Sequence, residues 1–90
     1  MLSIKVEKPA QDKLKTMNVF AWPIWEKEVS KFPWHYDEKE TCYMIQGRVK
    51  VTPKGGQPVE INAGELVTFP AGLDCEWNVL SPIKKHYRFG

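Results

Sequence analysis

Among the side chains of this sequence that could carry out chemistry, the carboxylate of Glu40 is the foremost candidate. A carboxylate enclosed among aromatic residues is costly unless it is paired or protonated. It could act as a general base, or bind a cationic or hydrogen-bond-donating group. The alternative is a structural carboxylate that bonds to Tyr36 or to a backbone amide. We therefore treat Glu40 as the main candidate catalytic residue, with the Tyr36 hydroxyl as a hydrogen-bond donor beside it.

The second candidate is the thiol of Cys75. A thiolate is a good zinc ligand, and a nucleophilic cysteine needs a base to activate it. The sequence contains two histidines. His35 lies between Trp34 and Tyr36, so on a strand it points to the opposite face. The direction of His86 cannot be decided from the sequence. Because free cysteine most often behaves as a small buried apolar residue, we expect Cys75 to line the site as a buried side chain rather than to act as a nucleophile.

Short strands must position these residues, since turn signals recur every ~8–12 residues, a spacing typical of β-sandwiches and barrels. Strands are predicted over residues 32–36, 41–46, 48–51, 59–61, 66–69, 75–79 and 85–89, with an edge strand over 3–7 and a short helix within 9–17. Alternation points Val49 and Val51 inward. The segment around Pro23 is expected to be an edge or a lid, because proline donates no backbone hydrogen bond.

The spacing of Glu40 and Gly47 resembles the first motif of the cupins, which are jelly-roll barrels of two antiparallel sheets. That motif has two histidines, then a glutamate, then a glycine after six residues. Glu40 and Gly47 match in type and spacing, whereas the histidine positions fall on Trp34 and Tyr36. The resemblance implies an all-β fold, a single cupin domain over residues 1–90 with the motif-bearing barrel over about 20–90, and a short N-terminal helical turn.

The second cupin motif is also present. Gly64, Pro70 and Gly72 match it without a gap, and Cys75 takes its histidine position. Within the cupins, the segments 22–26, 40–43 and 85–87 look like those of short single-domain cupins similar to the cupin domain of (S)-ureidoglycine aminohydrolase, a larger, manganese-dependent enzyme. This resemblance implies a small nitrogen-containing substrate.

In metal-bearing cupins, three histidines and one glutamate point into the barrel and hold a divalent ion. Trp34 has no lone pair for a metal, and the phenol of Tyr36 normally ionises only near pH ~10. If a metal were bound, its ligands would be Glu40, Cys75 and Tyr36. Soft sulfur with two oxygens and no imidazole suits no common metal well. We therefore expect neither a metal nor another cofactor.

The same resemblance implies a pocket inside the barrel. Its predicted lining is Trp34, Tyr36, Glu40, Phe69, Cys75 and Trp77. Trp77 shares strand parity with Cys75, so the two should face inward together. Aromatic walls around a carboxylate suit flat amides, ureido groups or organic cations. The alternative, favoured for Trp77, is that the rings simply fill a small barrel.

Composition limits the remaining possibilities. Thirteen basic and eleven acidic residues are mixed along 90 residues, which argues against nucleic-acid binding. No apolar segment approaches the ~20 residues needed to span a bilayer, so no membrane partner is expected. Two cysteines are too few for a disulfide scaffold, and a cytoplasmic location is expected, with organelle import left open. A barrel this small would gain from forming a homodimer.

Three functions fit these observations. The first is an enzyme acting on a small nitrogen-containing metabolite, with Glu40 and Tyr36 as its catalytic residues. The second is a non-catalytic small-molecule binding module built on a degenerate metal site. The third is a dimeric interaction module that uses Trp22 and Trp25 at its surface. Whether the protein is an enzyme is left open by the sequence.

Overall fold

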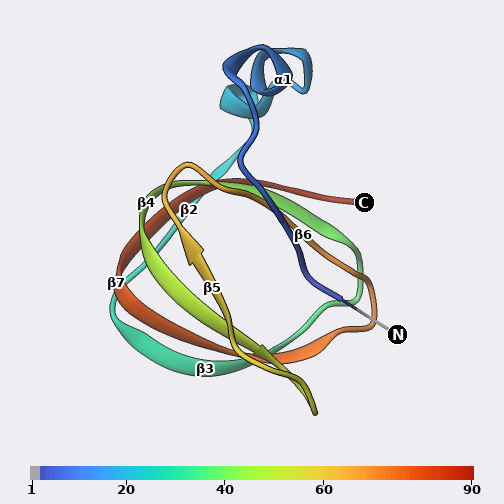
Figure 1. The fold of residues 1–90 in the computed structure, drawn as a ribbon, viewed down its shortest axis with the longest axis vertical. Helices are drawn as coiled ribbons and strands as arrows, with labels where there is room; N and C mark the ends of the chain where they lie inside the picture. The colour runs from blue at the N-terminus through green and yellow to red at the C-terminus, as the bar shows by residue number, and fades with distance from the viewer. Residues whose placement is uncertain (1–2) are drawn as a thin grey trace.

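The computed structural model describes residues 3–90. In chain order the elements are β1 (Lys5–Glu7), α1 (Gln11–Thr16), the 3-10 helix η1 (Val19–Ala21), β2 (Ile24–Lys27), β3 (Ser30–His35), β4 (Glu40–Pro53), β5 (Val59–Asn62), β6 (Leu66–Phe69) and β7 (Asp74–Phe89). The strands curve into a ring, and α1 lies outside this ring, at the top of the view (Figure 1). The prediction of an all-β jelly-roll barrel with a short N-terminal helix is confirmed.

Two long strands, β4 and β7, organise the barrel. They pair with each other along nearly their whole length. One half of β4 also pairs with β6 and the other with β5, while β7 pairs with β3 and then with β2. All of these pairs are antiparallel, and β1 completes the sheet beside β6. Because β4 and β7 run through both halves, the two expected sheets form one continuous hydrogen-bonded sheet.

The separate strands predicted over 41–46 and 48–51 are wrong, because β4 is continuous through Gly47. Gly47 has φ of +89°, and the register of β4 against β7 shifts around it. A Cβ at this position would clash with the backbone carbonyl of Pro82. The irregularity also changes which residues face inward, since Met44 is buried before it and Val49 and Val51 after it.

The separate strands predicted over 75–79 and 85–89 are likewise one element, β7. Odd-numbered positions such as Trp77, Val79, Ile83 and Lys85 are buried, although Ser81 is only half-buried and the even-numbered His86 is buried as well. Pro82 is exposed within this strand and does not end it. One face of β7 therefore points into the barrel from one end of the strand to the other.

A small second core lies where α1 and η1 meet the barrel. It consists of Leu14, Val19 and Trp22, with Met17 and Tyr43 packed against it. Trp22 was expected at the surface, but it is only 9% exposed, and the Arg88 guanidinium lies 4.7 Å from its ring centroid. Trp22 therefore packs within this second core and is not a surface residue. Over residues 3–90, neither helix has the length and apolar character that crossing a membrane requires.

Candidate functional site

A buried hydrogen-bonded group of three residues lies inside the barrel, and we call Tyr36, Glu40 and Lys85 the polar triad. The Tyr36 hydroxyl donates to Glu40 Oε1 at 2.7 Å. The Lys85 ammonium donates to Glu40 Oε2 at 2.8 Å. Glu40 is 3% exposed and Lys85 is 4% exposed. Each carboxylate oxygen thus has one donor, so Glu40 is neither unpaired nor bonded to a backbone amide.

Lys85 also lies against two indole rings. Its Nζ is 4.5 Å from the centroid of Trp77 and 4.9 Å from that of Trp25. Both distances are within the range of cation–π attraction. Trp25 on β2 is the direct strand neighbour of Lys85 on β7, so backbone pairing fixes this contact. The ammonium is therefore held by one carboxylate and two aromatic faces.

The polar triad borders a cavity of about 140 Å³. The cavity is lined by Trp25, Phe32, Trp34, Tyr36, Glu40, Trp77, Lys85, Tyr87 and Phe89. Apart from Glu40 and Lys85, all of these residues are aromatic. Trp34 and Phe89 are 46% and 45% exposed, which places them at the mouth. A cavity of ~150 Å³ can hold benzene, so this one has room for a molecule of about six heavy atoms.

The structure brings four of the predicted site residues together at this cavity, namely Trp34, Tyr36, Glu40 and Trp77. Phe69 does not line it. Its ring is fully buried and stacks on Tyr36, with centroids 4.9 Å apart and planes at 11°. Phe69 therefore supports the wall from behind.

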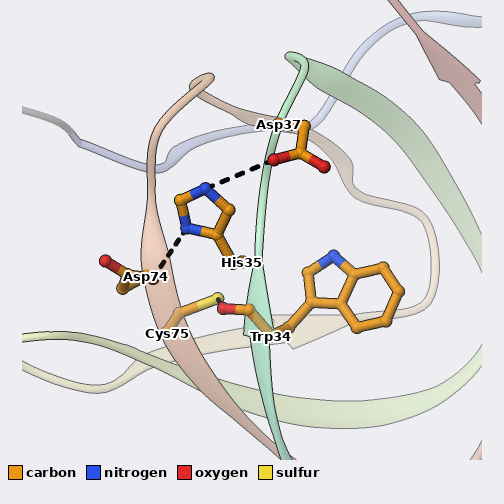
Figure 2. Close-up of polar contacts among 5 residues, drawn as sticks. All are labelled: Trp34, His35, Asp37, Asp74 and Cys75. Atoms are coloured by element: carbon orange, nitrogen blue, oxygen red, sulfur yellow. Dashed lines mark hydrogen bonds and ion pairs between the residues drawn. The ribbon is translucent and has the colours of Figure 1, made fainter.

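Cys75 does not line the cavity either. Its Sγ lies 3.6 Å from the backbone carbonyl of Trp34, toward which the thiol donates (Figure 2). Burial raises the pKa of the Cys75 thiol. A protonated thiol bonded to the backbone is a poor nucleophile. This geometry supports the interpretation of Cys75 as a packing residue.

Both histidines are engaged away from the polar triad. The His35 ring lies between two aspartates, with Nδ1 2.7 Å from Asp74 Oδ1 and Nε2 3.5 Å from Asp37 Oδ1 (Figure 2). Its side chain is exposed, in agreement with the predicted outward direction. His86 Nδ1 lies 2.9 Å from the carbonyl oxygen of Trp22. Neither ring is placed to activate Cys75.

The residues at the cavity do not fit a transition-metal site. Among residues 3–90, no three His, Cys, Asp or Glu side chains gather where they could hold a metal ion. Both oxygens of Glu40 already accept hydrogen bonds. Burial, together with the Glu40 carboxylate, raises the pKa of Tyr36 well above its ordinary value, so its oxygen is a donor and not a phenolate ligand.

The sequence-based site lacked Lys85, Trp25, Phe32, Tyr87 and Phe89. Trp25 was assigned to packing or to an interface, but it lines the cavity. A usable signal existed for three of these residues. Lys85, Tyr87 and Phe89 have the same parity as Trp77 on β7. Counting alternate residues from Trp77 through the whole strand would have placed all three on the inward face.

Comparison with known proteins identifies the family. The EutQ-like cupin domain model matches residues 14–87. A DUF861 family protein from Thermotoga maritima is 53% identical, with a TM-score of 0.96 over 98% of this chain and 100% of that one. None of the curated proteins compared with the chain matches it.

More distant structures share the fold. The EutQ protein of Clostridium difficile is 24% identical, with a TM-score of 0.67 over 73% of this chain and 52% of that one. A putative ethanolamine utilization protein Q from Salmonella typhimurium is 20% identical, with a TM-score of 0.67 over 73% of this chain and 53% of that one. This chain therefore spans about half the length of these EutQ proteins. The predicted cupin membership is confirmed: the chain belongs to the family of EutQ-like cupin domains.

Proposed function

We propose that the cavity binds a small, planar, nitrogen-containing metabolite that carries an amide or ureido group. The observation that supports this most is the pairing of Glu40 and Lys85 at the wall of an otherwise aromatic cavity. A carboxylate is an acceptor and an ammonium is a donor, and here they lie next to each other. An amide presents the matching arrangement, since its carbonyl accepts and its N–H donates.

The hydrogen-bonding capacity of the pair is not exhausted. An ammonium has three N–H donors, and Lys85 uses one of them on Glu40. A carboxylate can accept about four hydrogen bonds, and two donors to Glu40 are present. The pair is also neutral overall. A neutral polar ligand therefore suits the cavity better than an ion, whose charge would be buried without a partner.

Binding is supported more directly than catalysis. Glu40 and Lys85 present an acceptor and a donor side by side, which is what binding requires, whereas catalysis also requires a reacting group within reach of a base. Tyr36 keeps its proton, and in this arrangement it orients Glu40. The similarity to the (S)-ureidoglycine aminohydrolase group, proposed from the sequence, concerns the same class of compound. We therefore favour a binding pocket for ureido or amide compounds, with turnover as the property to be measured next.

The test compares two probes of about six heavy atoms, a size that the cavity accommodates. N,N′-dimethylurea has a carbonyl and two N–H groups, whereas diethyl ketone has the same shape without N–H. We expect the urea to shift the amide NMR signals of residues around Trp77 and Lys85 at lower concentration than the ketone. Glu40→Gln should remove most of that difference. Equal binding of the two probes, or an unchanged preference in Glu40→Gln, would rule out this function.

A third probe separates this proposal from the binding of organic cations. The ethanolammonium ion is a small amine whose charge would compete with Lys85 for Glu40. Because like charges in a buried site repel each other, we expect it to bind more weakly than N,N′-dimethylurea. Tighter binding of ethanolammonium would show that the pocket selects amines.

The dimeric interaction module is a second candidate function. The exposed apolar side chains Phe20, Ile24 and Val29 lie on or beside β2, which is at an edge of the sheet. An edge strand has unpaired backbone groups that a second copy could cover. Light scattering at micromolar concentration measures this directly. A dimer that Ile24→Lys converts to a monomer supports the module, and a monomeric wild type rejects it.

A further inference from the structure

The ammonium of Lys85 lies against the carboxylate that, by the resemblance, would bind a metal ion in metal-bearing cupins. Glu40 is the one ligand of the cupin metal motif that this sequence keeps. In the structure its charge is balanced by Lys85 at 2.8 Å. Both side chains are almost fully buried, so the balance is made inside the barrel and not by solvent.

We infer that Lys85 is the resident cation of this site and that the protein uses it in place of a divalent metal ion. Among the residues of 3–90 that line the cavity, Lys85 is the only basic one. It is anchored by a salt bridge and by the faces of two tryptophans. The inference concerns the unliganded site, so it holds whether or not N,N′-dimethylurea binds.

A divalent ion would be opposed by several features at once. It would have to displace Lys85 from Glu40 and give up the cation–π contacts with Trp25 and Trp77. If Lys85 stayed in place, two like charges would share a cavity of about 140 Å³. The replacement of imidazoles by Trp34, Tyr36 and Cys75 leaves few donors to compensate for these losses.

The first experiment measures metal in the wild-type protein purified without chelator. We expect inductively coupled plasma mass spectrometry to find less than one equivalent of manganese, zinc or nickel per protein chain. We also expect the melting temperature to stay unchanged when Mn²⁺, Zn²⁺ or Ni²⁺ is added in excess, or when a chelator is added. A ligand that binds only the folded state raises the melting temperature. A stoichiometric metal, or a clear rise on its addition, would overturn the inference.

The second experiment removes the ammonium and returns it in solution. Lys85→Ala removes three methylene carbons and the ammonium, and n-propylammonium supplies the same group. We expect Lys85→Ala to melt several degrees below wild type, and n-propylammonium to recover part of this loss, whereas uncharged n-propanol recovers less. Lys84→Ala should show neither effect. If Lys85→Ala melts like wild type, or if propanol rescues as well as the amine, the ammonium is not the resident cation.

A third variant keeps the test decisive if Lys85→Ala does not fold. Lys85→Arg keeps a positive charge beside Glu40, whereas Lys85→Met has similar length without charge. The inference predicts that the arginine variant gives more folded protein than the methionine variant. The opposite order would mean that chain packing, and not charge, is what the site requires.

Discussion

Replacing Lys85 by methionine should destabilise the protein strongly, although the two side chains have similar length. The change leaves the Glu40 carboxylate buried, with its Oε2 atom deprived of its donor. Glu40 would then have to be protonated, hydrated or moved, and each of these costs free energy. The salt bridge itself need not be a large net contributor, since both ions also lose their hydration on burial.

The structure sets the magnitude of this effect. Glu40 and Lys85 side chains are 3% and 5% exposed, so solvent cannot compensate for the lost partner. Breaking such a buried pair costs about 3–5 kcal/mol. The remaining hydrogen bond from Tyr36 to Glu40 moderates this cost. Since a domain of this size has a total stability of about 5–15 kcal/mol, Lys85→Met should be folded but much less stable.

The assay is urea denaturation of wild type, Lys85→Met, Glu40→Gln and the double variant. The double variant buries no unpaired charge, so it should be less destabilised than the sum of the single variants by about 1–3 kcal/mol. Lys84→Met, on the neighbouring position of β7, is the matched control and should change stability by less than about 0.5 kcal/mol. If Lys85→Met and Lys84→Met were equivalent, or if the two single effects simply added, the polar triad would not be formed as described.

Three further predictions concern residues around the cavity. Burial and the Glu40 carboxylate raise the pKa of Tyr36, so this phenol should stay protonated until the protein unfolds. Its contribution to stability should therefore fall as the pH rises above ~10. Before unfolding, wild type and Tyr36→Phe should give the same phenolate absorbance, and an excess in wild type would contradict the raised pKa. Burial raises the pKa of Cys42 to about 12, so in a Cys75→Ser variant this thiol should react with a disulfide reagent only as fast as the protein opens; rapid reaction would contradict the described burial. Gly47→Ala should lower the melting temperature by many degrees, since its Cβ would meet the Pro82 carbonyl, and an unchanged value would refute the close approach.

The sequence predicted much of the architecture because its signals are local. Leu66–Phe69 was predicted with the bounds that β6 has, and Val49 and Val51 face inward as alternation indicated. Glu40 was also placed inside the barrel, through the spacing of a motif. For the strands, a turn or a period of two carries the information, and for Glu40 it is the spacing of a motif of a few residues.

The residues that were missed depend on long-range pairing. Residues 75–79 and 85–89 were predicted as two separate strands, so the parity count from Trp77 was not carried on to Lys85. The segment around Pro23 was assigned to an edge or a lid, and Trp25 to packing or an interface. Only the pairing of β2 with β7 brings Trp25 over Lys85. No local pattern reports such a pairing.

Phe69 shows a different kind of difference. Its inward direction was correctly expected, but an inward side chain lines a cavity only if no other ring lies in front of it. Here Tyr36 stacks on Phe69 and separates it from the cavity. Side-chain packing of this kind is decided by the shape of the whole core and not by periodicity along one strand.

The most direct test of the account is a high-resolution crystal structure of the protein grown with N,N′-dimethylurea. The account predicts density for the urea between the rings of Trp34 and Trp77, with its carbonyl oxygen toward Lys85 and an N–H toward Glu40. It also predicts that the contact between Glu40 and Lys85 persists. An empty cavity at saturating urea, or Glu40 and Lys85 pointing away from each other, would contradict it.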